Sequence, residues 1–306
     1  VFSKGAKTHV TLTDASQSEN EVELMTIGAN GIYGFVGTGF TGFADQLTEE
    51  NLAGSSVTVR KPNAEAMGLY LSDMAFGLVL MKATASNDSY YGLQASVGKV
   101  GFQGLGDLVQ LTATDLDITV NGGHDTAVVD FTANTNWLGT GAVATGLVID
   151  DGTEGQTLFF NQRLLQASGT MTLQLDGYVY LTGTLVFRKG ATVHATLSNT
   201  SQAEVELMTI GASEVYGFVG TGFTQFTGNQ PNSDALGLYI SDVSLGLALM
   251  KGTGNNAASY YGLKANVGEV GLQGVSSIEL NASDLVLEVN GSSTTAVVSF
   301  QKTDWD

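Results

Sequence analysis

The chain has 306 residues, of which 30 are Asp or Glu and 12 are Lys or Arg, so its formal net charge is −18. Proteins that bind nucleic acid or anionic membrane surfaces need a basic patch, so we expect neither as a partner. The chain contains no Cys, which excludes disulfides, thiolate metal sites and cysteine nucleophiles. No apolar run approaches the ~20 residues needed to span a bilayer, so we expect no membrane insertion.

An internal repeat organises the chain. Residues 23–29 recur as residues 206–212, and residues 33–41 recur unchanged as residues 216–224. Self-similarity at a long, fixed period is the signature of a repeat protein. We therefore treat the chain as two copies of one structural unit.

The matches at the ends of the copies set the unit boundaries. Phe2 matches Phe187, which gives a period of 187 − 2 = 185 residues, and Trp137 matches Trp305. The first unit then spans residues 1–137, and connecting strands plus the second unit span residues 138–306. The first unit lacks a counterpart of the strands before Phe187. We expect the chain to be a piece of a longer array.

One loop differs in length between the two units. The offset between matching residues falls from 183 to 169 across it, so residues 44–67 of the first unit carry 14 more residues than residues 227–236 of the second. Both prolines of the chain, Pro62 and Pro231, lie in this variable loop. Proline cannot donate to a β-ladder, so its absence elsewhere favours long hydrogen-bonded strands.

Period-two alternation of apolar residues predicts strands throughout both units. In chain order, the clearest segments are residues 109–120, 173–180, 238–249, 265–272 and 278–289. Several contain a step of three at an acidic residue, as at Asp73, Asp115, Asp242 and Asp284, which we expect to form bends between consecutive strands. Strands joined at small polar corners predict an all-β, elongated parallel β-helix (β-solenoid). The uneven spacing of the corners leaves tandem antiparallel β-sandwiches as the alternative.

The segments 238–251, 259–265 and 281–290 together resemble repeat modules of very large bacterial surface proteins of the adhesin type. The resemblance extends over nearly the whole chain. It implies extracellular or cell-surface display, long arrays and an adhesive or matrix role. It assigns no functional residue.

The sequence offers few candidates for a metal site. His9 and His194 occupy equivalent positions, but no second ligand recurs beside either, and His124 has no counterpart. The acidic turn containing Asp150, Asp151 and Glu154 resembles half of a calcium-binding loop. We keep Ca²⁺ there as an option beside the simpler interpretation of an exposed hairpin turn, and expect no other cofactor.

Glycine and aromatic motifs have ordinary structural interpretations. Gly37-Thr38-Gly39 is not followed by a helical pattern, so it predicts a bend and no nucleotide loop. Adjacent strand residues face opposite sides, so one tyrosine of the pair Tyr90 and Tyr91 should be buried and the other exposed. The same holds for residues 260–261. Phe40, Phe43, Phe223 and Phe226 are expected in a core.

The sequence therefore predicts a non-catalytic, extracellular structural or adhesive segment. Its expected partners are copies of itself or adjacent repeats, and association into a fibre, sheath or surface array is one form of this role. A module that binds carbohydrate or a cell surface through the variable loop is the alternative. A polysaccharide-active enzyme on a β-helix is a distant third, because no acid–base constellation is recognisable.

Overall fold

The computed structural model describes the chain in segments. The described residues are 1–13, 20–45, 47–50, 56–104, 109–124, 127–133, 146–253, 258–275, 278, 280–303 and 305. They form strands, turns and bends, and none of them forms a helix long and apolar enough to cross a membrane.

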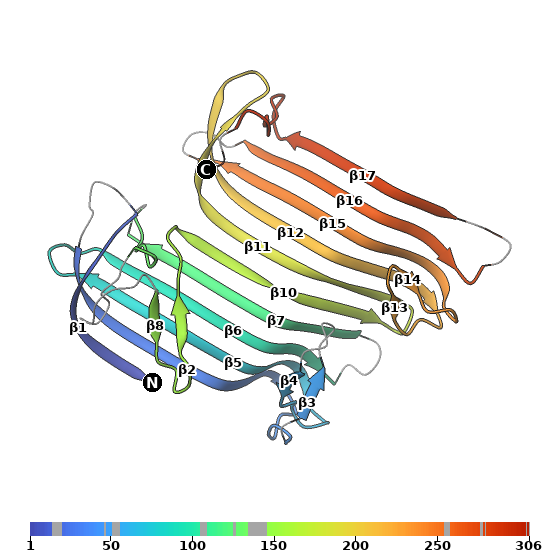
Figure 1. Cartoon of the computed structure of the whole chain (residues 1–306), viewed down its shortest axis with the longest axis horizontal. Coiled ribbons are helices and arrows are strands. Elements are labelled where there is room, and N and C mark those ends of the chain that lie inside the picture. Colours follow the sequence, from blue (N-terminus) through green and yellow to red (C-terminus); the bar gives the residue numbers. More distant parts are fainter. Residues whose placement is uncertain are drawn as a thin grey trace.

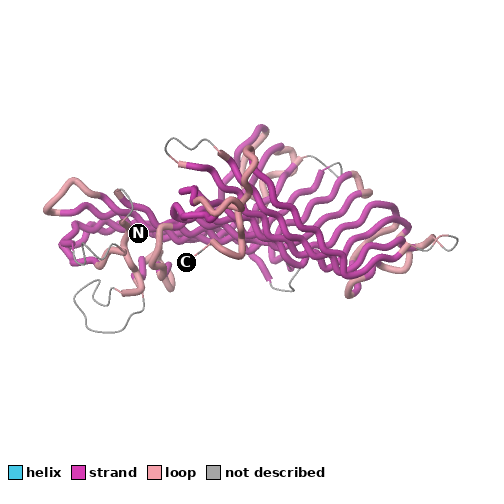
Figure 2. The backbone as a smooth tube through the Cα atoms, turned by 90° about the horizontal axis from the view of Figure 1, so that it is seen from above, coloured by secondary structure: helices cyan, strands magenta, loops and turns pink. Residues whose placement is uncertain are grey.

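One antiparallel sheet of eleven strands dominates the molecule (Figure 1). Its strands, in their order across the sheet, are β1 (Phe2–Val10), β2 (Asn20–Thr38), β5 (Met67–Ala83), β6 (Ser89–Gln103), β7 (Val109–Gly123), β10 (Leu164–Leu175), β11 (Val179–Thr196), β12 (Gln202–Thr221), β15 (Leu236–Gly252), β16 (Ser259–Gln273) and β17 (Asn281–Ser292). Each strand pairs with those next to it in this order, so the sheet is a meander. Viewed from above, the strands form one extended layer (Figure 2).

The expected fold is therefore wrong in its architecture, although the chain is all-β. Every strand pair in the sheet is antiparallel, whereas a β-solenoid stacks parallel rungs. The alternative of tandem sandwiches also fails, because the long strands of both units belong to a single sheet. Alternation identifies strands but does not distinguish a strand that turns back from one that continues around a rung.

The acidic corners lie inside continuous strands, not between consecutive strands as expected. Asp73, Asp115, Asp242 and Asp284 have φ values of 58°, 53°, 50° and 54° and lie within β5, β7, β15 and β17 respectively. A single residue in the left-handed region lets a strand continue while its alternation shifts by one position. Asp tolerates this conformation better than most side chains.

The two units use equivalent strands in the same order. β1 corresponds to β11, and β2, β5, β6 and β7 correspond to β12, β15, β16 and β17. β10 lies between the units and pairs with β7 on one side and β11 on the other. The units are thus joined by backbone hydrogen bonds within one sheet.

The variable loops lie at the same end of the sheet in both units. They contain the small hairpins β3 (Leu47–Glu50) with β4 (Ser56–Val59) and β13 (Phe226–Thr227) with β14 (Gln230–Pro231). Figure 1 places both beyond the end of the strands that they connect. Each hairpin adjoins an aromatic cluster, with Phe35 stacked on Phe40 at 5.0 Å and Phe218 stacked on Phe223 at 4.8 Å.

One face of the sheet carries the cores. In the first unit the buried cluster includes Val22, Val79, Met81 and Tyr90, and in the second it includes Val205, Met250 and Tyr260. The chain after β7 and after β17 folds back over this face, pairing through the bridges Leu12 to Val129 and Leu197 to Val298.

The opposite face is apolar and belongs to no core cluster of the described residues. One cross-strand row runs through ten strands as Ala29, Phe76, Ala95, Ile118, Ala167, Phe187, Ile210, Leu247, Leu263 and Val289. The neighbouring row on the same side is Ile27, Leu78, Leu93, Val120, Leu165, Lys189, Met208, Leu249, Tyr261 and Gly291. We call these two rows the apolar face.

Candidate functional site

A small hairpin covers the core face of the first unit. It consists of β8 (Leu147–Ile149) and β9 (Gln156–Leu158) and contacts β2, β5 and β6 (Figure 1). Leu147, Ile149 and Leu158 are at most 2% exposed, whereas Val148, which points the other way, is 51% exposed. The hairpin therefore presents one apolar side to the sheet.

Glycines in the sheet make room for this hairpin. A Cβ at Gly77 would lie 2.8 Å from Cβ of Gln156 and 3.0 Å from Cβ of Ile149, and a Cβ at Gly28 would clash with the backbone of Asp150. At Gly92 a Cβ would lie 2.7 Å from the side chain of Leu158. Glycine inside a strand often marks such a close approach.

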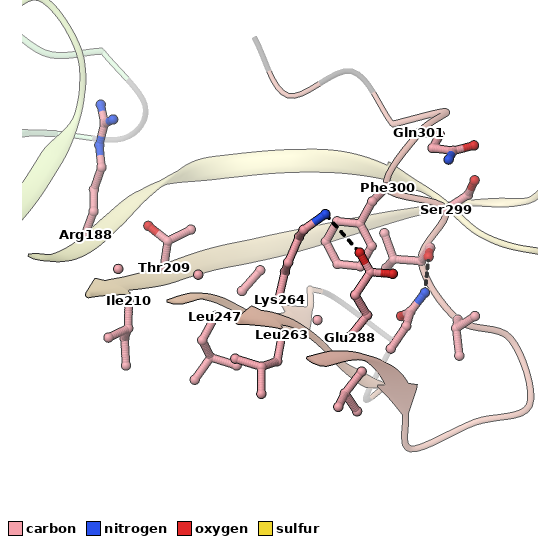
Figure 3. A pocket seen from close by; sticks show the side chains of 18 of the residues that line it. Arg188, Thr209, Ile210, Leu247, Leu263, Lys264, Glu288, Ser299, Phe300 and Gln301 are labelled. Carbon is pink, nitrogen blue, oxygen red and sulfur yellow. Dashed lines mark hydrogen bonds and ion pairs between the residues drawn. The ribbon is translucent and has the colours of Figure 1, made fainter. Parts of the chain in front are cut away.

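The equivalent surface of the second unit is a groove of ≈ 1200 Å³. Gly211, Gly246 and Gly262 lie on its floor at the positions of Gly28, Gly77 and Gly92 of the first unit. A Cβ at Gly246 would meet no atom within 4 Å. The segment 297–302 forms one wall (Figure 3).

Charged side chains stand on the floor and rim of the groove. Nζ of Lys264 lies 2.9 Å from Oε1 of Glu288, and both side chains rise into the groove in Figure 3, with Arg188 to one side. Ile210, Leu247 and Leu263 point away from the groove, toward the apolar face (Figure 3). At the position of Lys264 and Glu288 the first unit has a neutral pair, in which Thr119 donates to Gln94 at 2.9 Å.

The acidic turn that connects β8 to β9 is held by its own hydrogen bonds. Oδ1 of Asp151 accepts from N and Oγ1 of Thr153 at 2.9 and 2.7 Å, and Oδ2 accepts from Nε2 of Gln156 at 2.9 Å. Hydrogen bonds from Gln156 and Thr153 hold the pKa of Asp151 well below its usual range. Asp150, Asp151 and Glu154 do not form a group of ligands that could hold a metal, and no such group occurs elsewhere among the described residues. Asp151 is a structural acceptor of the turn.

The structure does not bring the histidines together. His9 and His194 are exposed in β1 and β11, opposite Glu21 and Glu204 respectively. Nδ1 of His124 lies 3.1 Å from Oδ1 of Asp88 at a loop.

The aromatic predictions are confirmed for the tyrosine pairs. Tyr90 and Tyr260 are 3% and 4% exposed, whereas Tyr91 and Tyr261 are 43% and 44% exposed. Phe223 and Phe226 pack against a buried cluster of Phe218, Ala235 and Tyr239, as expected of core residues. Phe40 does not fit the expectation, because it is 42% exposed in the aromatic cluster beside the variable loop of the first unit.

The groove is the site that the sequence analysis missed. The signal was present: Gly28 and Gly77 recur as Gly211 and Gly246 inside strands of high β-propensity. A strand-interior glycine suggests that another backbone approaches closely. Without the register, the glycines could not be placed side by side.

Comparisons with known proteins give no relative: no family model, curated protein or solved structure matches the chain.

Proposed function

We propose that the chain is a non-catalytic structural segment of an extracellular or cell-surface protein, whose apolar face is covered by association with further copies or repeats. The supporting observation is the apolar face, whose first row crosses both units without a polar residue and whose second row is interrupted only by Lys189. Monomeric soluble proteins rarely expose a contiguous apolar patch of this kind unless it is an interaction site.

The total surface supports the same proposal. The chain exposes 16790 Å² at a mass of 31.8 kDa, whereas a compact monomer of that mass exposes about 12,000 Å². Two sheets that pack face to face interdigitate their inner side chains and exclude water between them. We therefore propose that the apolar faces of two copies pack against each other.

Analytical ultracentrifugation of the purified chain tests this association. Leu247→Lys should reduce it, because the substitution places a charge in the middle of the apolar face. Val148→Lys is the control, since Val148 is already 51% exposed on the outer side of the hairpin. A monomeric wild-type chain, or a Leu247→Lys variant that associates as strongly as the wild type, would contradict the proposal.

Recognition of carbohydrate or a cell surface through the variable loops is the second candidate. The favouring observation is that the loops of both units lie at one end of the sheet (Figure 1). Replacing residues 44–67 and residues 227–236 each by a short glycine–serine linker should then abolish adhesion to a glycan-coated surface without changing association. The third alternative, a polysaccharide-active enzyme, was tied to a β-helix fold, and the sheet is antiparallel and not a β-helix.

A further inference from the structure

We propose that the groove of the second unit is a binding site for a β-hairpin of the β8–β9 type. The groove residues are equivalent to those that hold the hairpin in the first unit. The inference rests on the proposed function only in taking the partner to be a unit of the same kind.

The floors of the two sites have the same register. Gly28 pairs with Gly77 in the first unit, and Gly211 pairs with Gly246 in the second. The next residues along these rows are Gln94 with Thr119 and Lys264 with Glu288. The backbone therefore presents the same surface in both units, and among the residues that the structure describes only the first surface carries a hairpin.

Two of the three floor glycines, Gly211 and Gly246, have no packing reason within the described part of the second unit, whereas a Cβ at Gly262 would collide with the ring of Phe300. The Cβ that Gly77 lacks would collide with Gln156 and Ile149 of the hairpin, whereas a Cβ at Gly246 would reach open space. At Gly211 the nearest atom would be the carbonyl oxygen of Leu245, at 4.0 Å. Glycine weakens a strand interior, so keeping two of them paired here fits a surface shaped for a close-lying backbone.

An asparagine amide marks the same difference. Nδ2 of Asn121 donates to the carbonyl oxygens of Val129 at 2.9 Å and of Gln162 at 3.0 Å, and Gln162 lies just beyond the hairpin. Nδ2 of the equivalent Asn290 donates to the carbonyl oxygen of Val298 at 2.8 Å. Asn121 is 1% exposed, whereas Asn290 is exposed at the groove. A docked hairpin together with the residues that follow it, as in residues 146–163, would supply the second acceptor.

The groove carries a positive charge at the place where the acidic turn of a docked hairpin would lie. In the first unit the turn places Asp150 over Gly28, close to the row that contains Ser3 and Thr26. In the second unit the matching row contains Arg188 and Thr209, and Arg188 lines the groove. A guanidinium thus stands where the acidic turn of a docked hairpin would lie.

A peptide of residues 146–163, cross-linked between its ends, tests the proposal against the full-length chain. Cross-linking is needed because an isolated two-stranded hairpin is marginally stable in water. Trp305 serves as the reporter, because its ring lies 5.5 Å from the ring of Phe300, which lines the groove. Trp137→Phe leaves Trp305 as the only tryptophan. A scrambled peptide is the control ligand.

We expect a saturable change in Trp305 fluorescence with the peptide and none with the scrambled peptide. Gly246→Val should retain the circular dichroism spectrum of the parent and lose binding at least tenfold, because valine fills the space of the hairpin. Gly211→Ala provides a milder second variant at the floor. Arg188→Ser, which installs the residue of the first unit, should weaken binding several-fold and reduce its dependence on salt.

Two results would overturn the proposal: no response at millimolar peptide, or equal binding by Gly246→Val. Leu247→Lys separates this test from that of the proposed function, because Leu247 points away from the groove (Figure 3). Peptide binding that survives in a variant unable to associate leaves the groove assignment standing alone. Association without peptide binding leaves only the proposed function.

Discussion

Phe131 and Phe300 occupy equivalent positions in the two units, yet Phe131 is completely buried and Phe300 is 37% exposed. The ring of Phe131 packs edge-on against Phe160 at 4.9 Å, directly after β9, whereas the ring of Phe300 stacks on Trp305 at 5.5 Å. The same residue type thus has two environments, and the difference is the hairpin, which covers the first unit and has no counterpart among the described residues of the second.

The paired glycines Gly77 and Gly246 should respond in opposite ways to the same substitution. Gly77→Val should destabilise the chain by about 1–3 kcal/mol, because it overpacks the hairpin interface. Gly246→Val should be neutral or slightly stabilising, because valine favours strands and meets open space. Urea unfolding monitored by circular dichroism gives both values. Equal destabilisation by the two variants would contradict the assigned environments.

The hydrogen bonds of the turn between β8 and β9 should contribute less stability at low pH. The folded pKa of Asp151 lies below its unfolded value, so its stabilisation is full above about pH 4 and declines as the pH falls below that value. Asp151→Asn should lower the free energy of unfolding at neutral pH and flatten its dependence on pH between about pH 5 and pH 2. Urea titrations at a series of pH values measure this slope. An unchanged slope in the variant would show that other carboxyls dominate.

The contact between the variable loop of the second unit and the sheet should contribute less stability at high pH. Burial, followed by the hydrogen bond that Tyr239 donates to Glu269 at 2.6 Å, raises the pKa of Tyr239 to about 12. Because the folded state favours the protonated phenol, its stabilisation is complete below about pH 10 and is lost as the pH rises from there through the folded pKa.

Tyr239→Phe should remove this alkaline component. Gln230 donates to Tyr239 at 2.9 Å and to Glu269 at 2.8 Å, so the variant also loosens the contact between the loop and the sheet. Hydrogen exchange of the backbone amides of residues 226–230, compared between the variant and the parent, should be faster in the variant. Unchanged exchange would mean that the aromatic cluster alone holds the loop.

Replacing a non-glycine residue that has a left-handed backbone conformation inside a strand by glycine should stabilise the chain. Glu214 has φ 52°, and the equivalent residue of the first unit, Gly31, has φ 61°. Glu214→Gly should stabilise the second unit by about 1 kcal/mol, because glycine adopts this conformation without strain. Glu214→Val should lower the free energy of unfolding by at least about 1 kcal/mol, because a β-branched residue is strained in this conformation. Thermal unfolding of both variants shows whether each substitution stabilises or destabilises the chain. If Glu214→Gly is destabilising, the side chain of Glu214 makes a contact that contributes more stability than the relief of backbone strain.

The sequence predicts the strands well because their signal is local. Alternation within β7 and β17, and the absence of proline from the long strands, follow from the geometry of a single strand. The step of three at Asp115 and Asp284 was also a true signal, but it has two structural solutions. A left-handed residue can turn the chain into a new strand or shift the alternation inside the same one, and only the neighbouring strands decide between them.

The groove was beyond the reach of the sequence because it depends on pairing between distant segments. Gly211 and Gly246 are 35 residues apart, and their adjacency follows from the register of β12 and β15. The acidic turn illustrates the opposite case. Asp151 was visible as a candidate ligand, but its oxygens are used by Thr153 and Gln156 within the same turn. That use depends on hydrogen-bond geometry, which composition does not reveal.

The presence of β10 between the units determines whether equivalent strands of the two units run in the same direction. Passing from β1 to β11 crosses six antiparallel pairings, an even number, so these two equivalent strands point the same way. The second unit is therefore related to the first mainly by translation along the sheet, and both variable loops emerge at one end (Figure 1). With β10 removed the count would be odd, and successive loops would alternate between opposite ends. Two weak contacts made by loops on the same side can be engaged together, so β10 preserves the geometry that multivalent attachment requires.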